Sequence, residues 1–88
     1  MLLRMAVVDG IIDGRFDRVY RRWTAPRAKA GGRQRTPRGV LRVDGIERVT
    51  MGSLTSDDAK RSGHPTLKAL KAELGKRKGH VYRIDLSF

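Results

Sequence analysis

A cluster of cations and aromatic rings lies between residues 15 and 38. This segment holds nine basic residues against one acid, Asp17, so it carries +8 of the chain's net charge of +11. Tyr20 and Trp23 lie among the cations. Cations neutralise the phosphates of a nucleic acid, and aromatic rings stack on its bases. The segment therefore predicts a surface that binds RNA or DNA.

Eight of the nine cations are arginines. The planar arginine side chain matches a phosphate with two hydrogen bonds and also stacks on bases. Arg21 and Arg22 are the strongest candidates for a phosphate clamp. The alternative for Arg21 is a structural salt bridge to Asp17 or Asp85.

Tyr20 and Trp23 fall on opposite faces of an expected strand, so at least one of the two rings points inward. Trp23 lies next to an expected loop, and we expect it to be the exposed ring. The predicted nucleic-acid-binding residues are Arg15, Arg18, Tyr20, Arg21, Arg22, Trp23, Arg27, Lys29, Arg33, Arg35 and Arg38.

Other titratable residues predict no catalytic or metal site. Asp57 and Asp58 follow Thr55, a good helix N-cap, so we interpret both acids as first-turn residues that stabilise a helix start. His64 and His80 have no cysteine or second histidine at metal-ligand spacing. We therefore expect no metal and no cofactor, and we do not assign His64 as a base.

Length and composition predict one small domain, residues 1–88. The chain has no cysteine, which fits a reducing compartment. Its apolar start soon meets Asp9 and has no cleavage site, so it does not indicate a signal peptide. No apolar run is long enough to cross a bilayer. We predict a cytoplasmic protein, monomeric by default, with no membrane partner.

Helix and strand patterns follow one another along the first half. Residues 5–12 predict a short helix that ends at Gly14, and residues 16–23 alternate as a strand. Residues 24–38, rich in glycine, proline and arginine, predict a basic loop. Residues 39–51 predict β structure that slips at Asp44-Gly45, either as a hairpin turn or, as we prefer, as a bent strand.

The second half predicts two short helices and a strand. One helix starts after Thr55 and stops at Gly63. Another opens at Pro65, carries the apolar stripe Leu67, Leu70 and Leu74, and ends at Gly75. Residues 80–88 alternate as a strand. The expected fold is α+β and mainly β, a small barrel of about five or six strands with two or three short helices.

The order of these parts resembles an ASCH domain, a member of the PUA-like β-barrel superfamily. The resemblance covers almost the whole chain and rests on four stretches: IIDGRFDRVYRRW, GVLRVDGIERV, LTSDDAKRSGH and HVYRIDLSF. It implies a cleft beside the first strand that meets RNA or another nucleic acid.

The family's motif is Gly-x-Lys-x-x-Glu/Thr-x-Arg. Laid on this chain, it begins at Gly14 and ends at Arg21, which both match, whereas Phe16 and Val19 replace its lysine and its Glu/Thr. Relatives that resemble amidohydrolases rely on the lysine and the threonine. We therefore expect binding without catalysis.

Two other functions stay open at this point. A small nuclease, or an amidohydrolase of modified nucleosides, would need a proton acceptor, which Tyr20 beside Arg21, or His64, would supply. A protein-interaction module would instead meet an acidic partner through the same cations.

Overall fold

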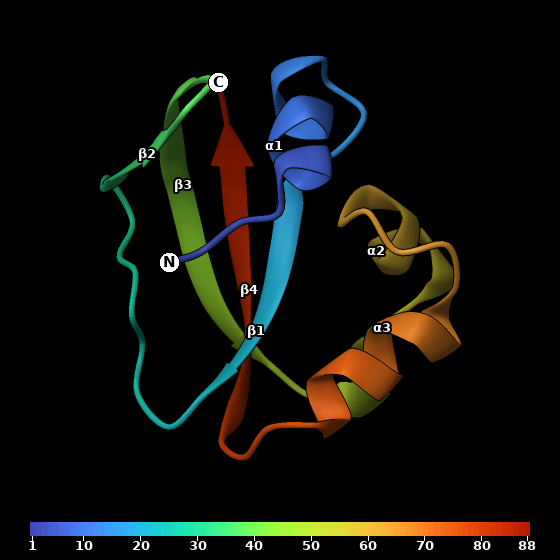
Figure 1. The fold of residues 1–88 in the computed structure, drawn as a ribbon. Helices are drawn as coiled ribbons and strands as arrows, with labels where there is room; N and C mark the ends of the chain where they lie inside the picture. Colours follow the sequence, from blue (N-terminus) through green and yellow to red (C-terminus); the bar gives the residue numbers. More distant parts are fainter.

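A computed structural model describes residues 1–88 and shows a mixed α+β fold (Figure 1). The chain forms four strands, three α-helices and one 3₁₀ turn. In order these are α1 (Met5–Ile12), β1 (Arg18–Trp23), β2 (Arg33–Thr36), β3 (Gly39–Val49), η1 (Met51–Ser53), α2 (Ser56–Arg61), α3 (Leu67–Gly75) and β4 (His80–Ser87). The α+β class is confirmed. None of the α-helices has the length and apolar character needed to cross a bilayer.

The four strands form one antiparallel sheet in the order β1-β4-β3-β2. The sheet curls into half a barrel and leaves β1 and β2 as its edges (Figure 1). The prediction of five or six strands is therefore wrong. Helices and turns occupy most of residues 50–79, so the chain has too few extended residues for a fifth strand.

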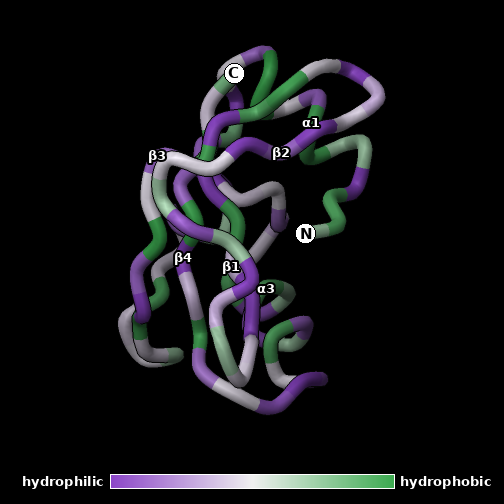
Figure 2. Tube along the Cα trace, turned by 90° about the vertical axis from the view of Figure 1, so that its left-hand side faces the viewer, coloured by the Kyte–Doolittle hydropathy of each residue, from purple (hydrophilic) through white to green (hydrophobic).

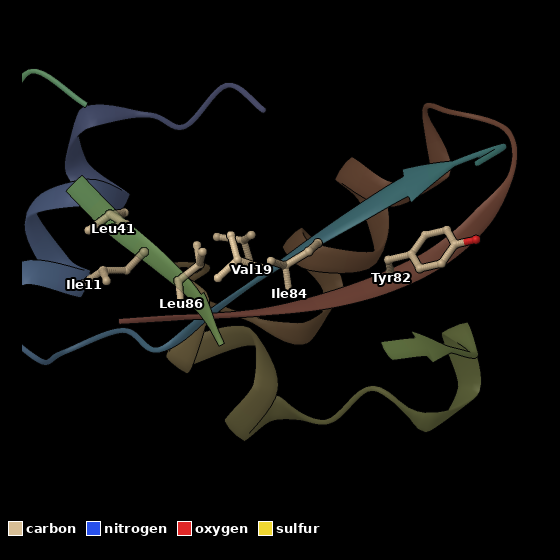
Figure 3. Close-up of a cluster of buried hydrophobic side chains, with 7 residues drawn as sticks. Ile11, Val19, Leu41, Tyr82, Ile84 and Leu86 are labelled. Atoms are coloured by element: carbon tan, nitrogen blue, oxygen red, sulfur yellow. The ribbon is translucent and has the colours of Figure 1, made fainter. Parts of the chain in front are cut away.

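Each face of the sheet carries its own apolar cluster. Neighbouring residues in a strand point to opposite faces, so Val19 and Tyr20 belong to different clusters. Val19 packs with Ile84 and with Ile11 of α1 (Figure 3). Tyr20 packs with residues of α2 and α3, including Leu70. Strand β1 is thus held from two sides, by α1 on one face and by the α2–α3 pair on the other.

Helix α1 ends as predicted, because Gly14 adopts a positive φ of 86° just after the C-cap. The chain then folds back, and the Phe16 backbone N–H donates to the Gly10 carbonyl at 3.0 Å. The Phe16 ring lies so close to Gly10 that a β-carbon there would sit 2.1 Å from a ring atom. Glycine at this position lets the chain pass from α1 into β1.

Strand β3 is one bent strand, as preferred from the sequence. Its pairing with β4 shifts register between Val43 and Gly45, which marks a bulge at the predicted slip. The strand ends at Val49 rather than Met51, because Met51 begins the 3₁₀ turn.

The predicted start of α2 is confirmed by a capping box. The Thr55 hydroxyl accepts from the Asp58 N–H, and the Asp58 carboxylate accepts from the Thr55 N–H. The prediction for α3 is wrong at its start and confirmed at its end. Its first helical residue is Leu67, after the N-cap Thr66, rather than Pro65, and its last residue is Gly75 as predicted.

The prediction of a loop over the whole of residues 24–38 is wrong at its end. Residues 33–36 form β2, which pairs with β3 across a tight turn at Pro37 and Arg38. Figure 2 shows β2 as hydrophilic along most of its length. An edge strand can keep charged side chains hydrated, so it needs no apolar alternation.

Candidate nucleic-acid interface

A cavity of about 730 Å³ lies beside β1. Five arginines and one acid, Glu73, line it together with Trp23. We call it the arginine cavity, after its lining residues Arg4, Arg21, Arg22, Arg27 and Arg77.

The fold builds this cavity around the edge of β1. Residues 1–4 line it, and so do Glu73 and Leu74 of α3 and Arg77 of the turn that follows. Figure 1 shows the N-terminal stretch, which leads into α1, in front of the strands, and it shows α3 beside the end of β1. Because consecutive strand residues alternate, Arg21 and Arg22 reach the cavity from opposite faces of the sheet.

Arg21 is half-buried and pairs with no carboxylate. Its guanidinium donates to the carbonyls of Tyr20 and Leu2, both at 2.9 Å. Asp17 and Asp85, the acids predicted as its alternative partners, pair with other arginines. The salt-bridge alternative for Arg21 is therefore wrong.

The surroundings of Arg21 disfavour its charge. Burial is the main cause that lowers the pKa of Arg21, and the neighbouring charges of Arg4 and Arg77 lower it further, against the opposing effect of Glu73. Burial removes the water that would stabilise the charge of Arg21. A bound anion would stabilise this charge in place of that water.

Two main-chain carbonyls hold the Arg22 side chain at the cavity. Its Nε donates to the Gly79 carbonyl at 2.9 Å, and Nη1 lies 3.5 Å from the Leu74 carbonyl of α3. These partners are neutral main-chain groups, so the positive charge of Arg22 remains available to an anion.

Tyr20 and Trp23 lie on opposite faces of β1, as the alternation predicts. Tyr20 is only 4% exposed and packs in the α2–α3 core, which leaves its ring no face for a base. Trp23 is half-buried, lines the cavity and rests on Tyr82 with ring centroids 5.9 Å apart.

Arg18 lies in the interior rather than at the predicted binding surface. Its side chain is 7% exposed, and it donates to Asp17 at 2.7 Å and to Asp58 at 2.9 Å. The hydrogen bond from Arg18 is the main cause that lowers the pKa of Asp17, and that same bond raises the pKa of Arg18. Arg18 thereby joins β1 to the start of α2.

The remaining predicted cations lie outside the arginine cavity. Arg15 pairs with Asp13 at 2.8 Å, and Arg38 pairs with Asp9 at 3.3 Å. Lys29 of the loop and Arg33 and Arg35 of β2 are exposed. Of the eleven predicted residues, the cavity brings together Tyr20, Arg21, Arg22, Trp23 and Arg27.

Sequence reasoning missed Arg4 and Arg77 as members of the site. Arg4 precedes the first helix, and Arg77 belongs to a basic turn, so both were visible as cations. Only the packing of the N-terminal stretch and of α3 around β1 places them beside Arg21.

A second cavity of about 290 Å³ adjoins the first and shares Arg4, Tyr20, Arg21 and Glu73 with it. Here His64 Nε2 lies 2.8 Å from the Glu73 carboxylate, and Nδ1 lies 3.3 Å from the Ser62 hydroxyl. The Ser62 hydroxyl is buried and already contacts two helix carbonyls. His64 is thus held between Glu73 and Ser62, and it does not line the arginine cavity.

The lowered pKa values of Asp17, Asp58 and Glu73 predict how the stability of the fold depends on pH. The pKa of Asp17 is lowered mainly by Arg18, and the pKa of Glu73 mainly by its hydrogen bond to His64. Burial pulls the pKa of Asp58 upward, but hydrogen bonds from Thr55 and Tyr20 outweigh it, and the net shift is downward.

A folded pKa below the unfolded value of about 4 contributes stability above about pH 4, which is lost as the pH falls through the folded pKa. We expect the urea midpoint to fall as acid is added below about pH 4. Asp58→Asn should make this fall shallower. A wild-type midpoint that stays constant down to about pH 2.5 would contradict the assignment.

No group of three or more His, Asp or Glu side chains in the structure is placed to hold a metal ion. Comparison with known proteins finds no family model, curated protein or solved structure that matches this chain. The resemblance to the ASCH family therefore stays a prediction, and the function is argued from the geometry of the cavity.

Proposed function

We propose that this protein binds nucleic acid, RNA or DNA, through the arginine cavity and does not cleave it. The observation that carries the proposal is the cavity itself, where five arginines face a single glutamate beside an aromatic ring. Concentrated positive charge in a concave site attracts a polyanion, and arginine suits phosphate oxygens. Trp23 adds a flat surface for a base.

The state of the candidate bases supports binding over hydrolysis. His64 is engaged at both ring nitrogens, and Tyr20 is buried in the core. His64 also lies outside the lining of the arginine cavity, so neither residue is placed as a free base beside a phosphate on Arg21. Phe16 and Val19 also replace the lysine and the threonine on which the amidohydrolase-like relatives in the ASCH family, which this chain resembles, rely.

The finer description of the fold is part of the same proposal. We propose that the half-barrel is an open, four-stranded form of a PUA-like barrel. The curled antiparallel sheet supports this description, as does the cleft beside the first strand.

Salt dependence tests the proposal. A fluorescently labelled oligonucleotide should bind with an affinity that falls about 50-fold between about 50 and about 200 mM salt, because about four phosphates release their counterions on binding. The measurement is fluorescence anisotropy, with the same samples run on a denaturing gel. An affinity that barely changes with salt would contradict the proposal, and so would shortened strands on the gel.

An acidic polypeptide is the control for non-specific charge. Polyglutamate offers carboxylates but no bases, so it should compete far more weakly than an oligonucleotide of equal charge. If it competes equally well, the cavity fits an acidic protein partner instead.

A further inference from the structure

We propose that the arginine cavity selects single strands over duplexes, with one phosphate on Arg21 and the base of the adjoining nucleotide on Trp23. This inference rests on the proposed function and specifies which form of nucleic acid the cavity takes. It is carried by the positions of the two side chains, by the support behind the ring and by the walls of the cavity.

Arg21 and Trp23 lie on the same face of β1. They are two residues apart, opposite Tyr82 and His80 of β4 respectively, and both line the cavity. Two strand residues span about 7 Å. A phosphate and the base of the next nucleotide in an extended strand can bridge such a separation, so one nucleotide step can use both residues together.

Both side chains are held in place before a ligand arrives. Two carbonyls fix the Arg21 guanidinium, and Tyr82 packs against Trp23 at an interplanar angle of 35°. A positioned ring loses little conformational entropy when a base stacks on it. One side of the ring rests on protein, and the cavity lies beside it.

The walls of the cavity exclude a duplex. Residues 1–4 and three residues at the end of α3 and just after it line the cavity together with β1, so the cations and the ring lie in a hollow rather than on a protruding element. Proteins that read duplex DNA insert a helix or strand pair into a groove, and duplex bases stay stacked on one another. A duplex would therefore reach the outer arginines but not the face of Trp23.

Trp23 is the only tryptophan of the chain, so its fluorescence reports directly on the site. We expect titration with a short single-stranded oligonucleotide to quench this emission. A blunt duplex of equal charge should bind at least about tenfold more weakly and should leave the emission nearly unchanged. A single strand with abasic sites keeps the phosphates and removes the bases, and it should also fail to quench.

Variants separate stacking from charge. By anisotropy of a labelled strand, Trp23→Ala should weaken single-strand binding about 5- to 150-fold, while Trp23→Phe should retain most of it. The loss in Trp23→Ala should nearly vanish with the abasic strand. The abasic comparison on the wild-type protein needs no variant, so the inference stays testable if Trp23→Ala does not fold.

The outcomes distinguish the inference from the function on which it rests. Equal affinity for duplex and single strand overturns the inference and leaves the proposed function standing. Equal affinity for normal and abasic strands does the same, because phosphates alone would then account for binding. If no nucleic acid binds at low salt, both the proposed function and the inference are overturned.

Discussion

Replacing Arg21 with glutamine is expected to weaken single-strand binding about 10- to 100-fold, since hydrogen bonds to charged groups contribute about 1.5–3 kcal/mol each. Arg21 is half-buried and pairs with no carboxylate, so its charge is weakly screened by solvent. Glutamine removes the charge and keeps a polar amide group, but its shorter side chain does not replace both hydrogen bonds to the Tyr20 and Leu2 carbonyls. The measurement is anisotropy of a labelled oligonucleotide at fixed ionic strength.

Arg35→Gln is the matched control for this variant. It removes the same charge from the exposed edge strand β2, away from the cavity. We expect its affinity loss to stay below about threefold, because an exposed cation is screened by salt. If both variants lose affinity equally, binding follows the overall charge of the protein and the cavity has no special role.

Replacing Arg18 with methionine is expected to lower the free energy of unfolding by about 3 kcal/mol, the lower end of the range for a broken buried ion pair. The side chain of Asp58 is only 17% exposed, and without Arg18 it would keep its charge with no cation beside it. Asp17 is less affected, because it is more exposed and keeps Arg61 as a partner. A loss of this size is a large part of the stability of a small domain.

Urea denaturation at neutral pH measures this loss. Arg61→Met is the control, since it removes the half-exposed partner of the same Asp17 and should cost less than about 1 kcal/mol. Folded Arg18→Met protein should still bind single strands about as well as Arg35→Gln. Unchanged stability, or a loss of affinity as large as that of Arg21→Gln, would contradict the structural role of Arg18.

The sequence carried enough local information to predict most of the elements. The glycine after α1, the bend at Asp44-Gly45 and the cap at Thr55 each depend on residues that are close in the chain, and all three occur in the structure. Strand β2 was missed because Arg33 and Arg35 give it no apolar alternation. Its existence depends on pairing with β3, which no local pattern reveals.

The composition of the site was harder to predict than its location. Alternation along β1 separates Tyr20 from Trp23, but the sequence does not say which face α2 and α3 cover. That packing decides that Tyr20 and Arg18 are interior while Trp23 lines the cavity. Arg77 joins the site from more than fifty positions away for the same reason. The clustering of cations in the sequence indicates that the site lies at β1. Tertiary packing determines which residues line the cavity.

A nuclear magnetic resonance titration tests the central claim most directly. An isotope-labelled sample would be followed through its arginine Nε–H and tryptophan indole N–H signals while a short single strand is added. We expect the largest shifts at the indole of Trp23 and at the guanidinium groups of Arg21 and Arg77, with Arg33 and Arg35 nearly unmoved. Shifts concentrated on β2, with the signals of the arginine cavity unchanged, would contradict the account.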